Sequence, residues 1–325
     1  MKICIFGGGS IGGLLAVNLE KIGINVGIIA RGQHLEVMKK NGLTLIDQTG
    51  EENTAIVTCT DAPNSLVVQD YLFLTIKSPA LLPSLKAMKP LIGKDTTIIT
   101  CMNGIPHWYF HKLDNKYANY KIKCLDPNLL IDTTLPPDNI VGSVVYPACE
   151  IVKPGTIKHI AGNRFSLGEP EGSESDRLKF ISDILKKAGF RAHIQKNIRD
   201  EIWLKLIGNL SFNPISALTG ATLEQICNDQ GTEAIVRAMM TEAKLIAEEL
   251  GAKINMSIEK RIDGARKVGA HKTSMLQDIE AGKPIEIDSI IIAVKELGEL
   301  TCSPTPYIDT ILNLTLQKAK LIGCL

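Results

Sequence analysis

The sequence predicts an α/β domain followed by an all-α domain. Over residues 1–196, short apolar runs typical of buried parallel strands alternate with helical segments. The first of these runs ends in a glycine-rich turn that opens a helix. From residue 197 almost to the end the periodicity is helical. Strands that alternate with helices, followed by a run of helices, indicate two domains, 1–196 and 197–325.

The composition is that of an ordinary globular protein and argues against nucleic-acid and membrane partners. The 325 residues, 45% of them hydrophobic, suit about two domains. Because 36 Lys and Arg balance 35 Asp and Glu, no nucleic-acid partner is expected. No apolar run approaches the roughly 20 residues of a membrane span, so no membrane association is expected. The eight cysteines are scattered and include no C-x-x-C pair, so we expect reduced thiols and no metal site. The N-terminus lacks signal-peptide features. Both observations favour a cytoplasmic location.

The first thirty residues have the pattern of a βαβ unit. Lys2 to Phe6 is a short apolar run, and an apolar helix face then ends at Gly23. Asn25 to Ala30 is a second apolar strand, and the crossover should be right-handed.

The remaining elements of the first domain follow the same alternation. Further strands are predicted at Leu43–Ile46, Ala55–Cys59, Tyr71–Ile76, Thr97–Met102, Val141–Cys149, Gly155–Ala161, Arg164–Leu167 and Arg191–Gln195. Helices are predicted at Pro79–Met88 and Glu174–Ala188. In the helical half, breaks are expected near Gly220, Gly251, Gly282 and Pro304–Pro306.

The turn after the first strand carries the spacing of a dinucleotide-binding motif. Gly7, Gly9 and Gly12 form G-x-G-x-x-G between a strand and a helix, which is the context that this motif requires. Glycines there allow a tight turn, close approach to a pyrophosphate, and close helix–strand packing. The helix start, with Ser10 and Ile11, offers N–H groups to the phosphates. This predicts a Rossmann-type doubly wound sheet; a glycine-rich turn in an unrelated α/β protein is the alternative.

The end of the second strand distinguishes between the two nicotinamide cofactors. NAD-binding folds usually place a carboxylate there, whereas an arginine suits the 2′-phosphate of NADP. This chain has Arg31 and no carboxylate until Glu36, which favours NADPH/NADP+. His34 and Lys39 are weaker candidates for the phosphate, and a solvated surface arginine is the alternative reading of Arg31.

Two more polar residues follow strands whose carboxyl ends should face the cofactor. Lys77 ends one strand, and Asn103-Gly104 ends another. Asn103 can hydrogen-bond the nicotinamide side of the cofactor or a substrate oxygen, or it can be a plain turn residue.

One helix in the second half carries a polar stripe in apolar sequence. Lys205, Asn209 and Asn213 recur every four residues and therefore share one helix face. If buried they need partners, and a substrate could supply them; a solvated face is the alternative. Farther on, Ser274 is an N-cap candidate and Glu286 falls in the first turn of a helix, both ordinary structural positions.

Taken together, these motifs resemble the ketopantoate reductases (2-dehydropantoate 2-reductases) over essentially the whole chain. The resemblance rests on the order and spacing of Gly7-x-Gly9-x-x-Gly12, Arg31, Lys77, Asn103-Gly104, Trp203-x-Lys205, Asn209-x-x-x-Asn213-Pro214, Ser274-Met275-Leu276-Gln277-Asp278 and Glu286-Ile287-Asp288. It implies that NADPH reduces the C2 ketone of 2-dehydropantoate to pantoate, in pantothenate and coenzyme A synthesis.

The resemblance also implies roles for individual residues. Lys205 would protonate the developing alkoxide, and Glu286 would bind the substrate hydroxyl or orient the lysine. The substrate's carboxylate and oxygens would be held by Asn209, Asn213 and Ser274. The cofactor would be bound by Gly7, Gly9, Ser10, Ile11, Gly12, Arg31, Lys77, Asn103 and Glu286, with Asn103 also positioning substrate. This arrangement would require an active site in a cleft between the domains.

Two alternative hypotheses differ from this one, the first in the substrate and the second in the class of protein. A related reductase could act on another small 2-oxo acid, because Trp108 and its aromatic neighbours add bulk that is expected beside the cleft. A non-catalytic NADPH sensor would need the glycines but neither Lys205 nor Glu286. A homodimer is compatible with all of these readings.

Overall fold

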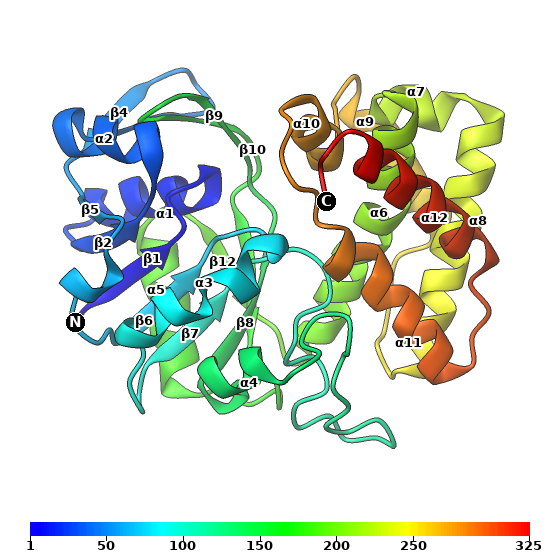
Figure 1. Ribbon diagram of the computed structural model, residues 1–325, viewed down its shortest axis with the longest axis horizontal. Coiled ribbons are helices and arrows are strands. Elements are labelled where there is room, and N and C mark those ends of the chain that lie inside the picture. Colours follow the sequence, from blue (N-terminus) through cyan, green and yellow to red (C-terminus); the bar gives the residue numbers. More distant parts are fainter. The chain divides into compact units, whose positions relative to one another are not determined.

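The computed structural model describes residues 1–325 as two compact units (Figure 1). The first unit comprises Met1–Met102 and Leu129–Ile198, and the second comprises Asn103–Asn128 and Arg199–Leu325. The later crossing point lies two residues beyond the predicted 196/197 boundary. The structure differs from that prediction in one respect, because residues 103–128 leave the α/β unit and pack with the helices.

An eight-stranded sheet forms the first unit. In spatial order its strands are β12 (Arg191–Ile194), β11 (Arg164–Gly168), β8 (Ile140–Val145), β7 (Thr97–Thr100), β6 (Tyr71–Leu74), β1 (Ile3–Phe6), β2 (Val26–Ile29) and β5 (Thr58–Thr60). All neighbours are parallel except β8 and β11.

The strand order confirms the predicted Rossmann-type sheet. From β5 to β8 the strands run 3-2-1-4-5-6 when they are numbered along the chain, which is the doubly wound dinucleotide-binding order. The order reverses between β1 and β6. Residues that follow these two strands therefore flank the crevice where ligands bind in such sheets.

A second, four-stranded sheet was not predicted. Its order is β4 (Glu52–Ala55), β3 (Leu43–Ile46), β10 (Thr156–Ala161) and β9 (Ala148–Lys153). The single strands predicted at Ala55–Cys59 and Val141–Cys149 are therefore wrong, because each is two strands that belong to different sheets. The second break falls at Pro147, which has no N–H to continue a ladder.

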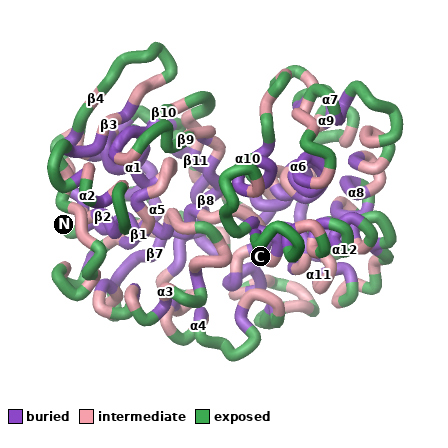
Figure 2. The backbone as a smooth tube through the Cα atoms, turned by 45° about the horizontal axis from the view of Figure 1, so that its top comes forward, coloured by how far each residue is buried: buried purple, intermediate pink, exposed green.

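Five α-helices belong to this unit, and three of them pack in one core with both sheets. They are α1 (Ser10–Lys21), α2 (Gly32–Asn41), α3 (Leu81–Met88), α4 (Leu130–Thr134) and α5 (Asp176–Lys187). One core cluster collects buried side chains of α1, α2 and α5 with those of both sheets. A Cβ at Gly13 of α1 would lie 1.8 Å from Ile157 of β10, so this glycine lets α1 contact the second sheet closely. Figure 2 shows the central strands buried.

The second unit is helical, as predicted. It contains α6 (Ile198–Thr219), α7 (Leu223–Asn228), α8 (Gln230–Glu249), α9 (Ile258–Val268), α10 (Ser274–Glu280), α11 (Ala293–Thr301) and α12 (Pro306–Leu321). A π-helical turn, Asp288–Ile292, leads into α11. Helix α8 packs against α7, α9, α11 and α12. None of the helices combines the length and apolarity that a membrane span requires.

Aromatic packing attaches the segment 103–128 to α6. The Trp203 indole N–H donates to the hydroxyl of Tyr109 at 2.8 Å, with the two rings edge to face. The Nε of Arg199 donates to the Tyr109 carbonyl at 2.7 Å. Trp108, Tyr109 and Phe110 are all buried, and burial raises the pKa of Tyr109 to about 12. These aromatic residues form core, so the prediction that they add bulk beside a cleft is wrong.

Candidate active site

The glycine loop after β1 has a backbone that other residues cannot follow. Gly7 has φ +122°, and a Cβ there would lie 2.8 Å from Ile76. A Cβ at Gly12 would lie 2.0 Å from the carbonyl oxygen of Gly7 and 2.7 Å from Oγ1 of Thr75. The loop is also tied to β2, since the amides of Gly7 and Gly8 both donate to the Ile29 carbonyl. The turn is tight, as the motif predicts.

The start of α1 leaves room and donors for an anion. Its N-cap is Gly9, which supplies no capping side chain, and no acidic residue lies in the first turn. A Cβ at Gly9 would meet nothing within 4 Å. The first N–H groups of a helix need an outside acceptor, and the helix dipole favours a negative one. The cradle formed by Gly9 with Ser10 and Ile11 thus fits the pyrophosphate of a dinucleotide.

Cationic side chains stand at the strand ends beside this loop. Arg31 is exposed and immediately precedes α2, and Lys77 is exposed at the end of β6, across the point where strand order reverses. His34 is different, because its Nδ1 accepts the amide of Gly155 at 3.0 Å. Burial lowers the pKa of His34, so it offers a phosphate little positive charge. Arg31 is the stronger candidate for a 2′-phosphate.

In the helical unit, the amide of Asn103 joins the two ionisable residues that the resemblance singled out. Lys205 Nζ donates to Asn103 Oδ1 at 2.7 Å, and Asn103 Nδ2 donates to Glu286 Oε2 at 3.0 Å. An ammonium group can only donate and a carboxylate can only accept, so these partners set the amide's orientation. A lysine ammonium held in this way can give a proton to, or stabilise, a developing alkoxide.

A close backbone contact supports this hydrogen-bonded line. Gly104 has φ +87°, and a Cβ there would lie 2.4 Å from the carbonyl oxygen of Ser289. The amide of Ile105 donates to that same oxygen at 2.8 Å. Ser289 lies in the π-helical turn just after Glu286, so both ends of the Asn103–Glu286 hydrogen bond are fixed to one piece of backbone. Burial also raises the pKa of Asp288 in this turn.

The polar stripe on α6 is not a solvated face. Lys205 and Asn209 are half-buried, and Asn213 is only 5% exposed. The Nδ2 of Asn213 is buried and has no hydrogen-bond partner. An unsatisfied buried donor costs about 1–3 kcal/mol, which an acceptor on a bound ligand would recover. The stripe is therefore a candidate ligand surface.

Two local predictions about the later helices are wrong. Thr273, not Ser274, is the N-cap of α10, since its side chain accepts the amide of Leu276. Ser274 is the exposed first residue of that helix, and its proposed substrate contact stays a prediction. Glu286 does not sit in the first turn of a helix but just before Ile287, and it is buried.

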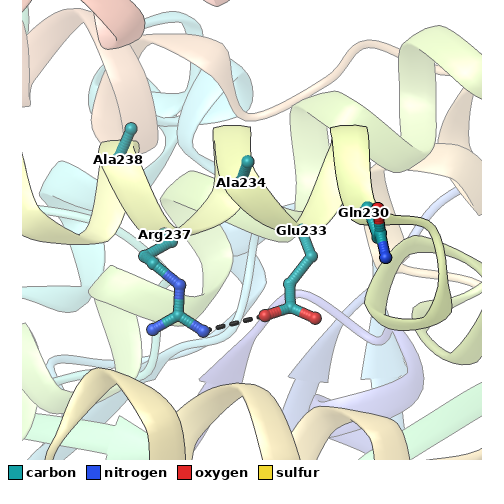
Figure 3. Close-up of a pocket in the computed structure, with 5 residues that line it drawn as sticks. All are labelled: Gln230, Glu233, Ala234, Arg237 and Ala238. Atoms are coloured by element: carbon teal, nitrogen blue, oxygen red, sulfur yellow. Dashed lines mark hydrogen bonds and ion pairs between the residues drawn. The ribbon is translucent and has the colours of Figure 1, made fainter.

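A hollow on α8 is not a second candidate site. It is lined by Gln230, Glu233, Ala234, Arg237 and Ala238 and measures about 330 Å³ (Figure 3). Its charged groups are already paired, because Arg237 bonds Glu233 and Glu259 at 2.8 Å each. Polar groups satisfied by one another offer little to a ligand.

Sequence reasoning missed two residues that shape the sites. Thr75 Oγ1 donates to the carbonyl of Gly7 at 2.7 Å, and Ser289 holds the backbone beside Asn103. Thr75 precedes Ile76 and Lys77 at the end of β6, so its position beside the glycine loop was a signal that could have been used. Nothing local in the sequence marks Ser289.

The first unit has the strand order of a dinucleotide-binding sheet, and the helical unit holds a lysine against an amide, an arrangement that fits a nicotinamide-dependent oxidoreductase. The chain matches the family models "Ketopantoate reductase PanE/ApbA" over residues 3–172 and "Ketopantoate reductase PanE/ApbA C terminal" over residues 197–319. The chain therefore belongs to the ketopantoate reductase family, as the motifs predicted.

Individual relatives agree with this assignment. A 2-dehydropantoate 2-reductase of Mesorhizobium japonicum is 48% identical over 100% of this chain and 99% of its own length. A solved Ralstonia solanacearum structure assigned as a ketopantoate reductase is 38% identical, with TM-score 0.94 and coverage of 100% and 99%. D-mandelate dehydrogenase bound to NADH and anilino(oxo)acetate shares the fold at 23% identity, with TM-score 0.85 and coverage of 99% and 100%.

Two alanine substitutions should separate cofactor binding from folding. Gly12→Ala places a Cβ against the Gly7 carbonyl and should lower the free energy of unfolding by about 1–3 kcal/mol. Gly9→Ala enters open space with an ordinary φ of −75°, so stability should be unchanged while NADPH binds about 10-fold or more weakly. Urea unfolding and NADPH titration measure these effects. Wild-type NADPH affinity in Gly9→Ala would show that the pyrophosphate does not approach there.

Proposed function

We propose that this protein is an NADPH-dependent 2-dehydropantoate 2-reductase, which converts the C2 ketone of 2-dehydropantoate to the alcohol of pantoate. The observation that carries the proposal is the hydrogen-bonded line Lys205–Asn103–Glu286. In this line an ammonium group, an amide and a carboxylate are hydrogen-bonded in sequence within the helical unit. The full-length likeness to relatives of that name supports the substrate and a role in pantothenate synthesis.

NADPH is the cofactor in this proposal, and the first unit holds it. Gly7, Gly9 and Gly12 shape the loop for the pyrophosphate, with the α1 amides as donors. Arg31 would pair with the 2′-phosphate, since no carboxylate follows β2 before Glu36. Lys77 adds a second positive charge at the neighbouring strand end. When bound, NADPH supplies the hydride that adds to C2.

The chain's own residues manage the charge that develops on the substrate. As C2 is reduced, its ketone oxygen becomes an alkoxide, and Lys205 gives that oxygen a proton from Nζ. Asn103 holds the ammonium through its Oδ1, and Glu286 holds Asn103 through Nδ2, so the donor is oriented before reaction. Asn209 and Asn213 offer amides to the substrate's oxygens, for which the unpaired Nδ2 of Asn213 is suited.

The competing readings make different demands on the chain. The shared fold of D-mandelate dehydrogenase means that the fold alone does not choose among oxo acids. A reductase of another 2-oxo acid would keep Lys205 and Glu286 and differ in the preferred substrate. A non-catalytic NADPH sensor would need neither residue.

We further propose that the enzyme works in the cytoplasm as a homodimer. Its eight cysteines are all unpaired, which suits a reducing compartment.

The dimer is proposed from an apolar stripe on one face of α12. It consists of Tyr307, Leu314 and Leu321, which recur every seven residues and are 48%, 48% and 81% exposed. A second copy would cover such an apolar stripe. Light scattering should give about twice the 35.4 kDa chain mass, and Leu314→Glu with Leu321→Glu should halve it. A monomeric wild-type protein would refute the dimer.

The activity itself is tested by NADPH oxidation at substrate concentrations that saturate the enzyme. Wild-type protein should turn over 2-dehydropantoate faster than any other 2-oxo acid in a panel. Lys205→Ala and Glu286→Ala should each lower kcat by about 100-fold or more, because general acid catalysis typically contributes 10²–10⁴. Their unfolding midpoints should change far less than their activities.

Each outcome separates the readings. If the enzyme prefers another 2-oxo acid, the assigned substrate is wrong but the assigned reaction, NADPH-dependent reduction of a 2-oxo acid, still holds. NADPH binding without turnover of any 2-oxo acid would support a sensor. Wild-type turnover in Lys205→Ala would remove that lysine from the mechanism.

Cofactor preference tests the role of Arg31 separately. Arg31→Asp should weaken NADPH by about 10-fold or more and change NADH much less, because only NADPH carries the 2′-phosphate. Fluorescence titration with each cofactor measures this difference. Lys40→Asp, at an exposed position of α2, is the matched control and should leave the preference intact. Equal weakening of both cofactors by Arg31→Asp would place Arg31 outside the phosphate site.

A further inference from the structure

An arginine lies directly against the helix that carries Lys205. A Cβ built on Gly208 of α6 would lie 2.1 Å from Nη2 of Arg261 and 2.7 Å from both its Cζ and Nε. The guanidinium group therefore occupies the space that any other residue at position 208 would fill. Glycine is the poorest helix former after proline, and Gly208 sits inside a 22-residue helix. Its presence is accounted for by the room it makes for Arg261.

The position of this contact on α6 places Arg261 beside the candidate site. Gly208 follows Lys205 by three residues and precedes Asn209. With 3.6 residues per turn, Gly208 lies about 60° from Lys205 on one side, and Asn209 lies about 40° from it on the other. Around the helix the order is thus guanidinium, ammonium and amide. The buried, unpaired Nδ2 of Asn213 continues the same surface.

The chemistry of a 2-oxo acid calls for this arrangement. Its carboxylate carbon is bonded directly to the ketone carbon, so the group that binds the carboxylate must lie next to the group that protonates the ketone oxygen. A guanidinium group matches a carboxylate with two parallel hydrogen bonds, which an ammonium group or an amide cannot do. Arg261 and Lys205 are cations of these two kinds, one lying against position 208 of α6 and the other rooted three residues earlier on the same helix.

We propose that Arg261, seated on Gly208, binds the substrate carboxylate and makes the enzyme select 2-oxo acids over neutral ketones. The proposal rests on the reductase function above and adds to it the residue that recognises the acid. Arg261 comes from the first turn of α9, so the acid would be held between two helices of the same unit.

Kinetics with a charged and a neutral substrate test the proposal. The substrates are 2-dehydropantoate and its lactone, which has the same carbon skeleton without a carboxylate. Arg261→Ala should raise KM for the acid about 10- to 100-fold, as expected for a lost charged hydrogen bond. The ratio of kcat/KM between acid and lactone should fall by a similar factor. NADPH affinity should stay within about twofold of wild type, and millimolar guanidinium chloride should restore part of the lost activity.

Further variants distinguish recognition from structure. Gly208→Ala keeps the charge of Arg261 but displaces the guanidinium group, so KM should rise while the melting temperature is unchanged or higher. Arg261→Lys keeps the charge without the two-pronged geometry and should remain impaired. Arg237→Ala is the matched control, because Arg237 pairs with Glu259 of α9 at the surface, and its KM should equal the wild-type value.

The failures are distinguishable. If wild-type protein turns over no 2-oxo acid, the proposed function is wrong and the assignment of Arg261 is wrong with it. If wild-type protein is active but Arg261→Ala keeps both the KM and the acid-to-lactone ratio, only Arg261 is wrongly assigned. A KM increase equal for acid and lactone would likewise contradict carboxylate binding.

Discussion

The side-chain amide of Asn103 is the constraint on which the candidate chemistry depends. Its oxygen accepts from Lys205 and its nitrogen donates to Glu286, so one small group orients a cation and an anion at once. Because each partner can bond in only one sense, the amide has one orientation. The backbone beside it is equally restricted, since Gly104 rests on the carbonyl of Ser289. An active site needs this kind of rigid support to orient a proton donor.

The two units offer a ligand different kinds of contact. In the first unit the contacts come mainly from the backbone. The positions of Gly7 and Gly12 leave no space for side chains, and the start of α1 offers uncapped N–H groups. In the second, side chains on α6 and the loop at Asn103 supply charge and hydrogen bonds. A substrate that differs from its competitors by a few atoms requires such specific polar groups, whereas a pyrophosphate is well met by backbone amides and a helix dipole.

Where prediction from sequence failed, a non-local contact decided the outcome. The apolar run at 55–59 reads as one strand, yet Ala55 pairs with β3 and Cys59 pairs with β2 in separate sheets. The aromatic segment at 108–110 follows a strand of the α/β unit, yet the Tyr109–Trp203 hydrogen bond attaches it to the helical one. The cap of α10 is a local exception: the helix begins at Ser274, so its N-cap is the preceding residue, Thr273.

By itself the sequence determined the strand–glycine–helix start, the arginine that ends β2, and the stripe of Lys205, Asn209 and Asn213. Each of these is a local pattern, set by spacing within one or two elements. Only the tertiary structure decided which residues meet: Asn103 lies 102 residues from Lys205 and 183 from Glu286. The same holds for Arg261 and Gly208. The guanidinium group of Arg261, from α9, fills the space that a side chain at position 208 of α6 would occupy. Such contacts depend on how distant elements pack. The resemblance implied that Asn103, Lys205 and Glu286 serve one site, but no local pattern predicts their hydrogen bonds.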